Sequence, residues 1–506
     1  MKIFKALATT IIFIAALTSI FYLLGFDEII KLSPGGIHYI RQTDSLSFVF
    51  QFYWKNYSLL EPHVFNQTST DGKAACEFPL IYFIVAKLYR LFGEKESIFR
   101  LFHLILFTLS MVSIQMVIQP ISKIISFIIP LAILPSTILL YYSANFLPEI
   151  SAFSFVILAL SLMAYIHQKG YRTITGVAIM ILITLSTLTK ITYGIYGVAI
   201  SLLILYLFWN KQISKKRFIE FFILISICTL IVIGWYSYAA FYNNTHGDEY
   251  FLLKARPIWE KPSADWNSLF NFITHYWNSA FYHPLLRYFF TLTFIWNLFY
   301  YGKYNRAVQL FVGSIVLGCL SIFFLFSLQL VDHDYYFICF VPAIAINLFY
   351  FFLSIRNFKY YYQSSLLVSA VAIVSGLVYA HNKLDQRYFR KIESQQMISM
   401  RLTHGDRMLD TLGVSRHDKI LIIGDETRNG GLYALKRNGI SVTNEQLINT
   451  ENLLIQLSDK NNFIILMDTL LLDTIKLHPD DFRFFGEVNH HKVFKIENNY
   501  SRNSLE

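Results

Sequence analysis

The sequence contains few charged residues: Asp, Glu, Lys and Arg together make up only 15% of its 506 positions. Soluble globular chains are about a quarter charged, so an ordinary soluble protein is excluded. Hydrophobic residues instead reach 55%, and the mean hydropathy is +0.45. This composition places the chain among the integral membrane proteins before any motif is considered.

Several patterns that mark other classes of protein are absent. The four cysteines form no C-x-x-C pair, which excludes a disulfide framework and a cysteine zinc site. No Walker or G-x-G-x-x-G spacing surrounds the glycines of residues 424 and 430–431, so they are interpreted as turn residues rather than as a nucleotide loop. No A-x-A-like cleavage site follows the first apolar run, which therefore predicts an uncleaved first membrane helix.

Long apolar runs predict a polytopic all-α bundle of about eleven transmembrane helices, because one crossing needs roughly 20 apolar residues. The runs cover residues 4–24, 98–118, 123–142, 149–167, 173–189, 191–209, 219–241, 282–300, 307–330, 335–354 and 362–380. The run 78–92 is shorter and contains Lys87 and Arg90, so we expect a helix lying in the membrane interface. Pro79 suits the first turn of that helix.

Charge asymmetry between the loops predicts the orientation of the chain. Basic residues gather in alternate short loops, which explains the net charge of +10 without a nucleic-acid partner. The positive-inside rule places these loops and the N-terminus in the cytoplasm. The acidic loops, at about 25–97 and 242–281 among others, then face outward. We expect a multi-pass protein of the plasma (inner) membrane with an extracytoplasmic C-terminal region, periplasmic in a Gram-negative cell.

Two domains are expected. Residues 1–380 form the membrane domain, and residues 381–506 form a small outward α/β domain. In the second, residues 419–425 and 462–468 have the pattern of buried strands, residues 446–458 have helical spacing, and residues 482–488 and 491–496 predict a terminal hairpin.

Two carboxylates in the outward segments are candidates for catalysis. Asp44 follows His38 and Arg41 at intervals of three residues, and a carboxylate beside an arginine stays ionised and can accept a proton from a hydroxyl. An ordinary Arg–Asp surface pair explains that spacing equally well. Glu149 follows Pro148 at the outer end of an apolar run, where a carboxylate usually faces the bundle interior or a wet cavity.

Other polar residues are candidates for binding. Glu77 precedes the interfacial helix, where it suits either a structural charge or a metal or substrate ligand. His333 can ligate a metal with a neighbouring carboxylate orienting its ring, although metal-site spacing is absent. Arg100 can hold a phosphate or anchor a helix at the interface, and Lys190 can bind an anion or extend its charge to the membrane surface.

Five short segments, taken in order, resemble the GT-C glycosyltransferases, which include protein O-mannosyltransferases and the lipid A aminoarabinose transferase. The segments are RQTD (41–44), EFPLIYFIVAKLYRLFGEKESIFRL (77–101), NFLPEI (145–150), LTK (188–190) and HDYYFICFVP (333–342). The resemblance covers roughly residues 1–380. It agrees with an odd number of crossings followed by an outward domain.

The resemblance implies an inverting transfer of one sugar, on the extracytoplasmic face, from a polyprenyl-phosphate donor to a hydroxyl or phosphate acceptor of unknown identity. Asp44 matches the family's catalytic aspartate, and Glu149 resembles the acid of its second outward loop. Glu77 resembles the acid implicated in binding a divalent metal or the donor. Phe78 stands where the family often has a lysine, so the donor phosphate would need other cations. The candidates are Arg41, Arg100, Lys190 and Arg256.

Other functions stay open at this stage. A transporter or flippase needs ionisable groups near the middle of the membrane, whereas most charges here lie at helix ends. A polysaccharide polymerase would also place its site on the outer face, so topology does not exclude it. A sensor or scaffold whose outward domain is the working part is a third alternative.

Overall fold

The computed structural model describes residues 2–170, 172–251, 254–390, 392–443, 462–467 and 482–496. The chain divides into two compact units that interleave along the sequence. The bundle unit comprises Met1–Leu32, Glu96–Ser237 and Leu253–Arg387, and the sheet unit comprises Ser33–Lys95, Tyr238–Leu252 and Tyr388–Glu506. The predicted domain boundary at residue 380 stays a prediction.

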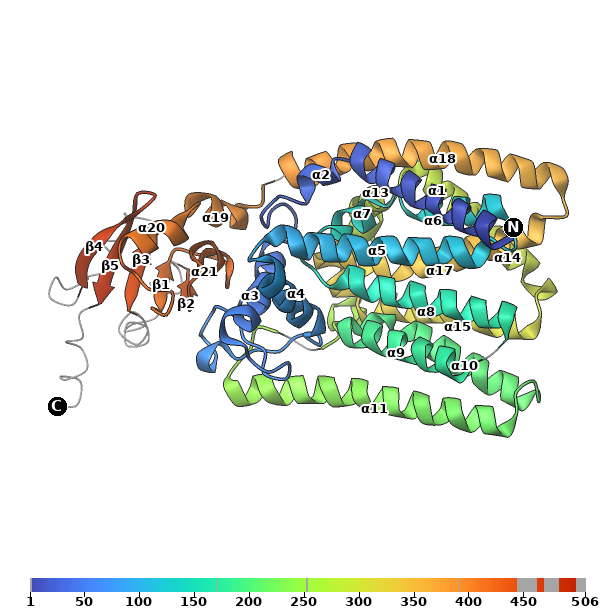
Figure 1. Ribbon diagram of the computed structural model, residues 1–506, viewed down its shortest axis with the longest axis horizontal. Helices are drawn as coiled ribbons and strands as arrows, with labels where there is room; N and C mark the ends of the chain where they lie inside the picture. Colours follow the sequence, from blue (N-terminus) through green and yellow to red (C-terminus); the bar gives the residue numbers. More distant parts are fainter. Residues whose placement is uncertain are drawn as a thin grey trace. The chain divides into compact units, whose positions relative to one another are not determined.

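The bundle is made of helices, the longest of which run roughly parallel to one another (Figure 1). They are α1 (Lys2–Leu23), α5 (Glu96–Ile118), α6 (Lys123–Ile133), α7 (Thr137–Ser143), α8 (Glu149–Lys169), α9 (Thr173–Thr189), α10 (Gly194–Trp209), α11 (Lys215–His246), α14 (Pro284–Tyr300), α15 (Arg306–Leu325), α17 (Val341–Ile355) and α18 (Lys359–Asp385). Shorter helices connect them: α2 (Phe26–Ile29), α12 (Trp266–Phe272), α13 (Asn278–Phe281) and α16 (Ser327–Asp332). The predicted membrane bundle is confirmed.

The number of crossings is smaller than predicted when each helix is judged by length and composition. Among the described residues, 8 helices are long and apolar enough to span a membrane, or up to 9 if one bent pair counts as a single crossing. Each of the predicted runs contains a helix. The difference arises at α9 and α14, which have 17 residues each and fall short of the roughly 20 that a crossing needs.

The predicted span 123–142 is broken rather than straight, because α6 and α7 meet at 85°. Pro135 explains the break. Its ring restricts the backbone of the preceding residue, and its backbone nitrogen carries no hydrogen to donate to a helical hydrogen bond. The Ser136 side chain then accepts a hydrogen bond from the backbone N–H of Leu139 at 3.2 Å and caps the new helix.

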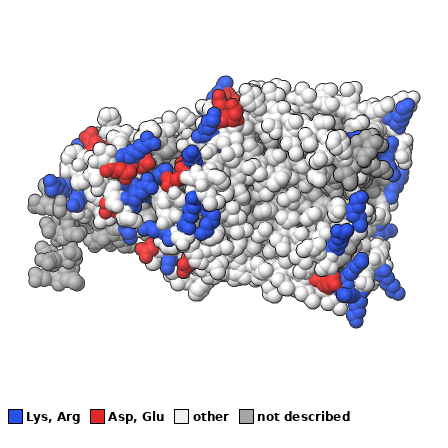
Figure 2. Space-filling view, viewed as in Figure 1, with Lys and Arg blue, Asp and Glu red and all other residues white. Residues whose placement is uncertain are grey.

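Charged side chains are unevenly distributed over the bundle. Figure 2 shows that much of the bundle surface on this face carries none, and that Lys and Arg predominate at the end where the N-terminus lies in Figure 1. This distribution agrees with basic loops gathered on one side, as the sequence predicts. Which side of the membrane that end occupies stays a prediction.

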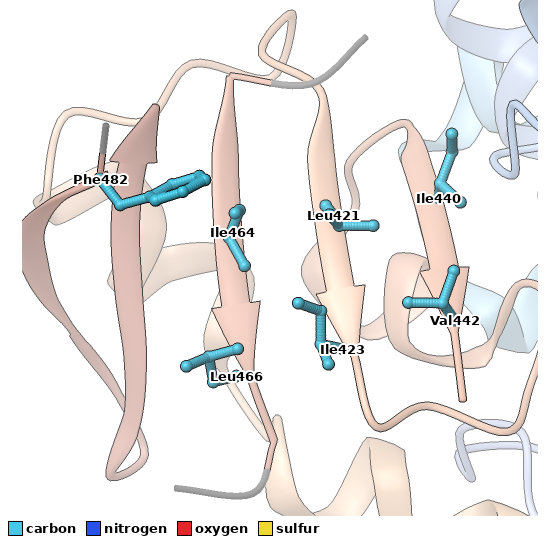
Figure 3. Close-up of a cluster of buried hydrophobic side chains, with 7 residues drawn as sticks. All are labelled: Leu421, Ile423, Ile440, Val442, Ile464, Leu466 and Phe482. Carbon is cyan, nitrogen blue, oxygen red and sulfur yellow. The ribbon is translucent and has the colours of Figure 1, made fainter. Parts of the chain in front are cut away.

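A five-stranded sheet lies in the sheet unit, with the strand order β2-β1-β3-β5-β4. Its strands are β1 (Ile420–Ile423), β2 (Gly439–Val442), β3 (Phe463–Leu466), β4 (Phe482–Val488) and β5 (His491–Ile496). β1 pairs in parallel with β2 and β3, whereas β5 runs antiparallel to β3 and β4. Apolar side chains from four of these strands form its core (Figure 3).

The α/β domain and its terminal hairpin are therefore confirmed, while β2 was not predicted. The expected helix at 446–458 lies outside the described residues. The interpretation of Gly430 and Gly431 as turn residues is wrong, because both lie in α21 (Gly430–Leu435). Two other short helices, α19 (Met397–Arg401) and α20 (Gly405–Thr411), precede the sheet.

Two helices from the first long loop also belong to the sheet unit: α3 (Tyr39–Lys55) and α4 (Leu80–Phe92). α4 follows Pro79 and has 13 residues, too few to cross a membrane, as expected for the run 78–92. α3 begins where the Glu393 carboxylate accepts the backbone N–H groups of His38 and Tyr39, at 3.0 and 3.2 Å. A carboxylate at this end of a helix satisfies donors that have no partner within the helix.

Candidate functional site

Asp44 is a buried carboxylate on α3, with 1% of the residue exposed. Both of its oxygens accept hydrogen bonds from other segments of the sheet unit. The Asn429 amide donates to Oδ1 at 2.7 Å, and the Tyr250 hydroxyl donates to Oδ2 at 3.1 Å. An ionised carboxylate is stabilised when each oxygen receives a donor.

Burial raises the pKa of the Asp44 carboxyl above its usual value, because it disfavours the charged form. Arg41, Asn429, Arg428 and Tyr250 all oppose this rise, since each stabilises the negative charge. A raised pKa brings the carboxylate closer to the range in which a general base works well near neutral pH.

Arg41 and Glu77 form an ion pair beside Asp44. Arg41 lies one helical turn before Asp44, and its Nη2 is 2.6 Å from Glu77 Oε2. The Tyr82 hydroxyl donates a second hydrogen bond to Glu77. The side chains of Arg41 and Glu77 are 16% and 10% exposed, so both charges are largely shielded from water. The structure thus brings Arg41, Asp44 and Glu77 together.

Glu149 and Lys190 meet in the bundle unit. Glu149 is the first residue of α8, Lys190 directly follows α9, and Lys190 Nζ lies 2.8 Å from Glu149 Oε1. The ammonium group also lies over the rings of Tyr335 and Tyr336, 4.8 and 4.0 Å from their centroids. This is a favourable place for a partly desolvated cation.

The ion pair with Lys190 uses only one of the two carboxylate oxygens of Glu149. Oε2 is buried and has no hydrogen-bond partner within the described part of the chain. The hydroxyl of Tyr193, three residues after Lys190, is also buried and has no hydrogen-bond partner among the described residues. Buried polar atoms are nearly always paired, so unpaired ones indicate a place for water or for a ligand group.

The remaining predicted site residues lie elsewhere in the bundle unit. Arg100 on α5 is fully buried and donates to the carbonyl oxygens of Leu32 and Ala144, at 2.9 and 2.5 Å. These bonds hold backbone segments together, and the predicted phosphate contact stays a prediction.

Arg256 and His333 are less buried than Arg100. Arg256 pairs with Asp332 at 3.0 Å, and the two side chains are 38% and 49% exposed. His333 stacks on Tyr335, with ring centroids 5.1 Å apart. No group of three or more His, Cys, Asp or Glu side chains able to hold a metal ion occurs among the residues that the structure describes.

Three contacting residues were not predicted from the sequence. Asn429 and Tyr250 reach Asp44 from segments far along the chain. In the bundle unit, Arg387 pairs with Asp334 at 2.8 Å, and Asp334 also accepts the Tyr142 hydroxyl at 2.6 Å. The sequence gives a signal near Asn429, which a Gly-Gly pair follows, and at the partner of Arg387, which lies in the charged cluster 332–334. It gives none for Tyr250.

Five of the predicted residues therefore form one group within each unit. Arg41, Asp44 and Glu77 share the sheet unit, whereas Glu149 and Lys190 share the bundle unit. A cavity common to Asp44, Glu77 and Glu149 stays a prediction.

Part of the sequence matches a known protein family. Residues 75–236 match the family described as dolichyl-phosphate-mannose-protein mannosyltransferase. No curated protein matches the sequence.

Solved structures resemble nearly the whole chain. ArnT from Cupriavidus metallidurans, in the apo state, has a TM-score of 0.62 at 11% identity and covers 97% of this chain and 98% of its own. The same protein bound to undecaprenyl phosphate gives 0.63, at the same identity and coverage. The Archaeoglobus fulgidus oligosaccharyltransferase gives 0.58 at 12% identity, over 91% of this chain and 69% of its own.

These proteins are GT-C glycosyltransferases, and none is similar enough in sequence to show more than a shared fold. The predicted resemblance is confirmed, and the chain has the GT-C fold.

Proposed function

We propose that this protein is a membrane glycosyltransferase that moves one sugar from a polyprenyl-phosphate donor to an acceptor hydroxyl on the extracytoplasmic face. The observation that carries the proposal is Asp44, a buried carboxylate with hydrogen-bond donors on both oxygens and an arginine one turn away. The proposal is also supported by the fold that the chain shares with ArnT, one structure of which holds undecaprenyl phosphate.

In this proposal Asp44 is the general base. The acceptor oxygen attacks the anomeric carbon as Asp44 takes the hydroxyl proton, and the new C–O bond forms on the face opposite the phosphate. The bond from the anomeric carbon to the phosphate oxygen breaks, and its electron pair leaves with polyprenyl phosphate. Configuration at the anomeric carbon is therefore inverted.

Tyr250 indicates where the acceptor hydroxyl would lie. Its hydroxyl donates to Asp44 Oδ2 at 3.1 Å, which is the hydrogen bond that an acceptor must make before losing its proton. Tyr250 is 40% exposed, whereas Asn429 on the other oxygen is fully buried. We therefore propose that Oδ2 of Asp44 takes the proton of the acceptor hydroxyl, which replaces the Tyr250 hydroxyl at that oxygen.

The donor phosphate gains negative charge as the sugar leaves, and cations nearby stabilise that charge. We assign this role to Lys190, because Glu149 and two tyrosine rings hold its ammonium group in place. Arg41 is the second candidate. Its guanidinium already lies on the carboxylate of Glu77, so a metal ion on Glu77 would have to displace it. A divalent metal stays a prediction, and no step is assigned to one.

The proposed activity is tested with purified protein in lipid vesicles and a panel of undecaprenyl-phosphate monosaccharides carrying radiolabelled sugars. A glycosyltransferase should release undecaprenyl phosphate and transfer label to an acceptor in a cell-envelope extract. A transporter or flippase would leave the phosphate–sugar bond intact. A polymerase should not consume this monosaccharide donor. An intact donor across the whole panel would contradict the proposal.

Lys190→Met should weaken binding of undecaprenyl phosphate by about ten- to a hundredfold, because one hydrogen bond between charged groups contributes about 1.5–3 kcal/mol. Titration of the lipid into protein held in nanodiscs measures this affinity. Lys303→Met is the matched control: Lys303 also lies over a tyrosine ring, 5.0 Å from the centroid of Tyr300, but on the predicted cytoplasmic side.

The same substitution leaves Glu149 buried without its partner, which by itself destabilises the fold. The double variant Glu149→Gln/Lys190→Met removes that charge and should recover stability without recovering affinity. Unchanged binding in the stable double variant would remove Lys190 from the donor site.

A further inference from the structure

We propose that the C-terminal domain completes the catalytic site, with Asn429 as the positioning residue that orients and sustains the charge of Asp44. The proposal rests on the role of Asp44 as base. It gives residues 428–431 of this domain a part in the reaction.

The orientation of the Asn429 amide follows from its partners. Its Oδ1 accepts the backbone N–H of Asn66 at 2.9 Å and the hydroxyl of Ser47 at 3.4 Å. A backbone N–H can only donate, so the oxygen must face Asn66 and the NH₂ group must face Asp44. Asn429 is fully buried, and its hydrogen bond to Asp44 is therefore protected from water.

The loop that carries Asn429 is held rigidly by Asp425. One carboxylate oxygen accepts the N–H and the hydroxyl of Thr427, at 2.7 and 2.6 Å. The other accepts the N–H of Gly431 at 3.1 Å and the hydroxyl of Ser441 at 3.0 Å. The Thr427 hydroxyl in turn accepts the N–H of Gly430 at 2.9 Å. Such a network fixes the backbone on both sides of Asn429.

Gly430 allows this loop to approach α3 closely. A Cβ at this position would lie 2.8 Å from Cε1 of Tyr39 and 2.4 Å from the hydroxyl oxygen of Thr427, too close for either atom. A side chain would therefore push the loop away from α3. This contact explains the first glycine of the Gly-Gly pair. At the second, Gly431, a Cβ would lie 2.5 Å from Asp425 Oδ2.

The second hydrogen bond to Asp44 depends on the same loop through Arg428. Arg428 forms an ion pair with Asp248, whose side chain is fully buried, and its guanidinium carbon lies 4.5 Å from the ring centroid of Tyr250. These contacts hold the segment 248–251, from which Tyr250 reaches Asp44 Oδ2. One hydrogen bond to the Asp44 carboxylate thus comes from residue 429 itself, and the other comes from Tyr250, whose segment residue 428 holds in place.

The charged and titratable groups around Asp44 are Arg41 on its own helix, Arg428 on the loop after β1, and Tyr250 on the segment that follows α11. All of these groups favour the ionised carboxylate, as the Asn429 amide does, against the effect of burial. Removing the amide should therefore raise the pKa of Asp44 further, and more of the base would be protonated at a given pH.

Asn438 provides a matched control. It is also an asparagine of the C-terminal domain that contacts α3, but its side chain bonds to Gln51 rather than to Asp44. Asn438→Ala should weaken the attachment of the domain to α3 without changing the carboxylate. Asn429→Ala should do both, so the difference between the two variants isolates the effect on Asp44.

The test uses dicyclohexylcarbodiimide, an apolar reagent that attacks protonated carboxyl groups. Full-length protein is treated across a pH series, and labelling of Asp44 is measured by mass spectrometry. The midpoint should rise by about one to two pH units in Asn429→Ala, the size expected from losing one hydrogen bond to a charged group. It should not move in Asn438→Ala. The acidic limb of kcat for sugar transfer should shift in the same way, with little change in KM.

An unchanged midpoint in Asn429→Ala, or an equal shift in Asn438→Ala, would overturn the proposal. If the alanine variant unfolds, Asn429→Ser takes its place, since its hydroxyl is small enough for the buried position. Labelling requires no sugar donor. Failure of the transferase function would appear as an intact donor in the wild-type protein, whereas failure of this inference would appear as an unmoved midpoint.

Discussion

Asp44→Asn is expected to reduce sugar transfer by about a hundredfold to ten-thousandfold, the range attributed to a positioned general base. The amide has nearly the same shape as the carboxylate but cannot take the acceptor proton. Expression and membrane insertion should persist. Transfer is measured as release of polyprenyl phosphate from a radiolabelled donor.

Glu94→Gln is the control for loss of one negative charge in the same unit. Glu94 pairs with Lys436 at 2.5 Å and has no assigned part in the reaction. That variant should transfer at close to the wild-type rate. Full activity in Asp44→Asn would instead remove Asp44 from the role of base.

The wild-type enzyme should lose activity as the pH falls. The reaction needs ionised Asp44, and burial raises the pKa of this carboxyl above the ordinary value of about 3.9 for an aspartate. The rate is therefore complete above the raised pKa and declines as the pH falls through it. A pH profile of kcat that stays flat down to the ordinary aspartate range would contradict this expectation.

Arg387→Met is expected to destabilise the bundle by about 3–5 kcal/mol, because it leaves the charge of Asp334 buried without a partner. Asp334 is fully buried and the Arg387 side chain is 6% exposed, so water cannot solvate the carboxylate that remains. The Tyr142 hydroxyl alone, 2.6 Å from Asp334, does not neutralise it. Unfolding in detergent with a chemical denaturant measures the loss.

The double variant Asp334→Asn/Arg387→Met should recover much of that stability, since no uncompensated charge is left. The exposed pair Arg256–Asp332 provides a comparison, and Arg256→Met should cost only about 0–1 kcal/mol. Additive losses in the double variant would show that Asp334 and Arg387 do not interact as an ion pair.

Hydropathy alone predicted where the membrane helices lie, because each crossing requires an apolar run that the bilayer dictates. It did not predict the 85° break between α6 and α7, since proline geometry leaves the apolar character of residues 123–142 unchanged. It also counted the 17-residue helices α9 and α14 as full crossings.

Site residues were predictable only where the chain keeps them close. Arg41 and Asp44 lie one turn apart, so spacing placed them together. The ion pair between Arg41 and Glu77 was not predicted, because 36 positions separate them. The expected roles of Arg41 at the phosphate and of Glu77 at a metal or the donor stay predictions. Asn429 stands 385 positions from Asp44, and no local pattern in a single sequence encodes such a contact.

The proposed mechanism requires that Asp44 and the Glu149–Lys190 pair face the same, extracytoplasmic side of the membrane. In a protein freed of its native cysteines, single cysteines at Thr70 and Ile191 report on the loop that follows Asp44 and on the neighbour of Lys190; both positions are exposed. A membrane-impermeant maleimide added outside intact cells should label both, while a cysteine at Lys216 should react only after permeabilisation. Labelling of positions 70 and 191 from opposite sides of the membrane would contradict a shared extracytoplasmic site.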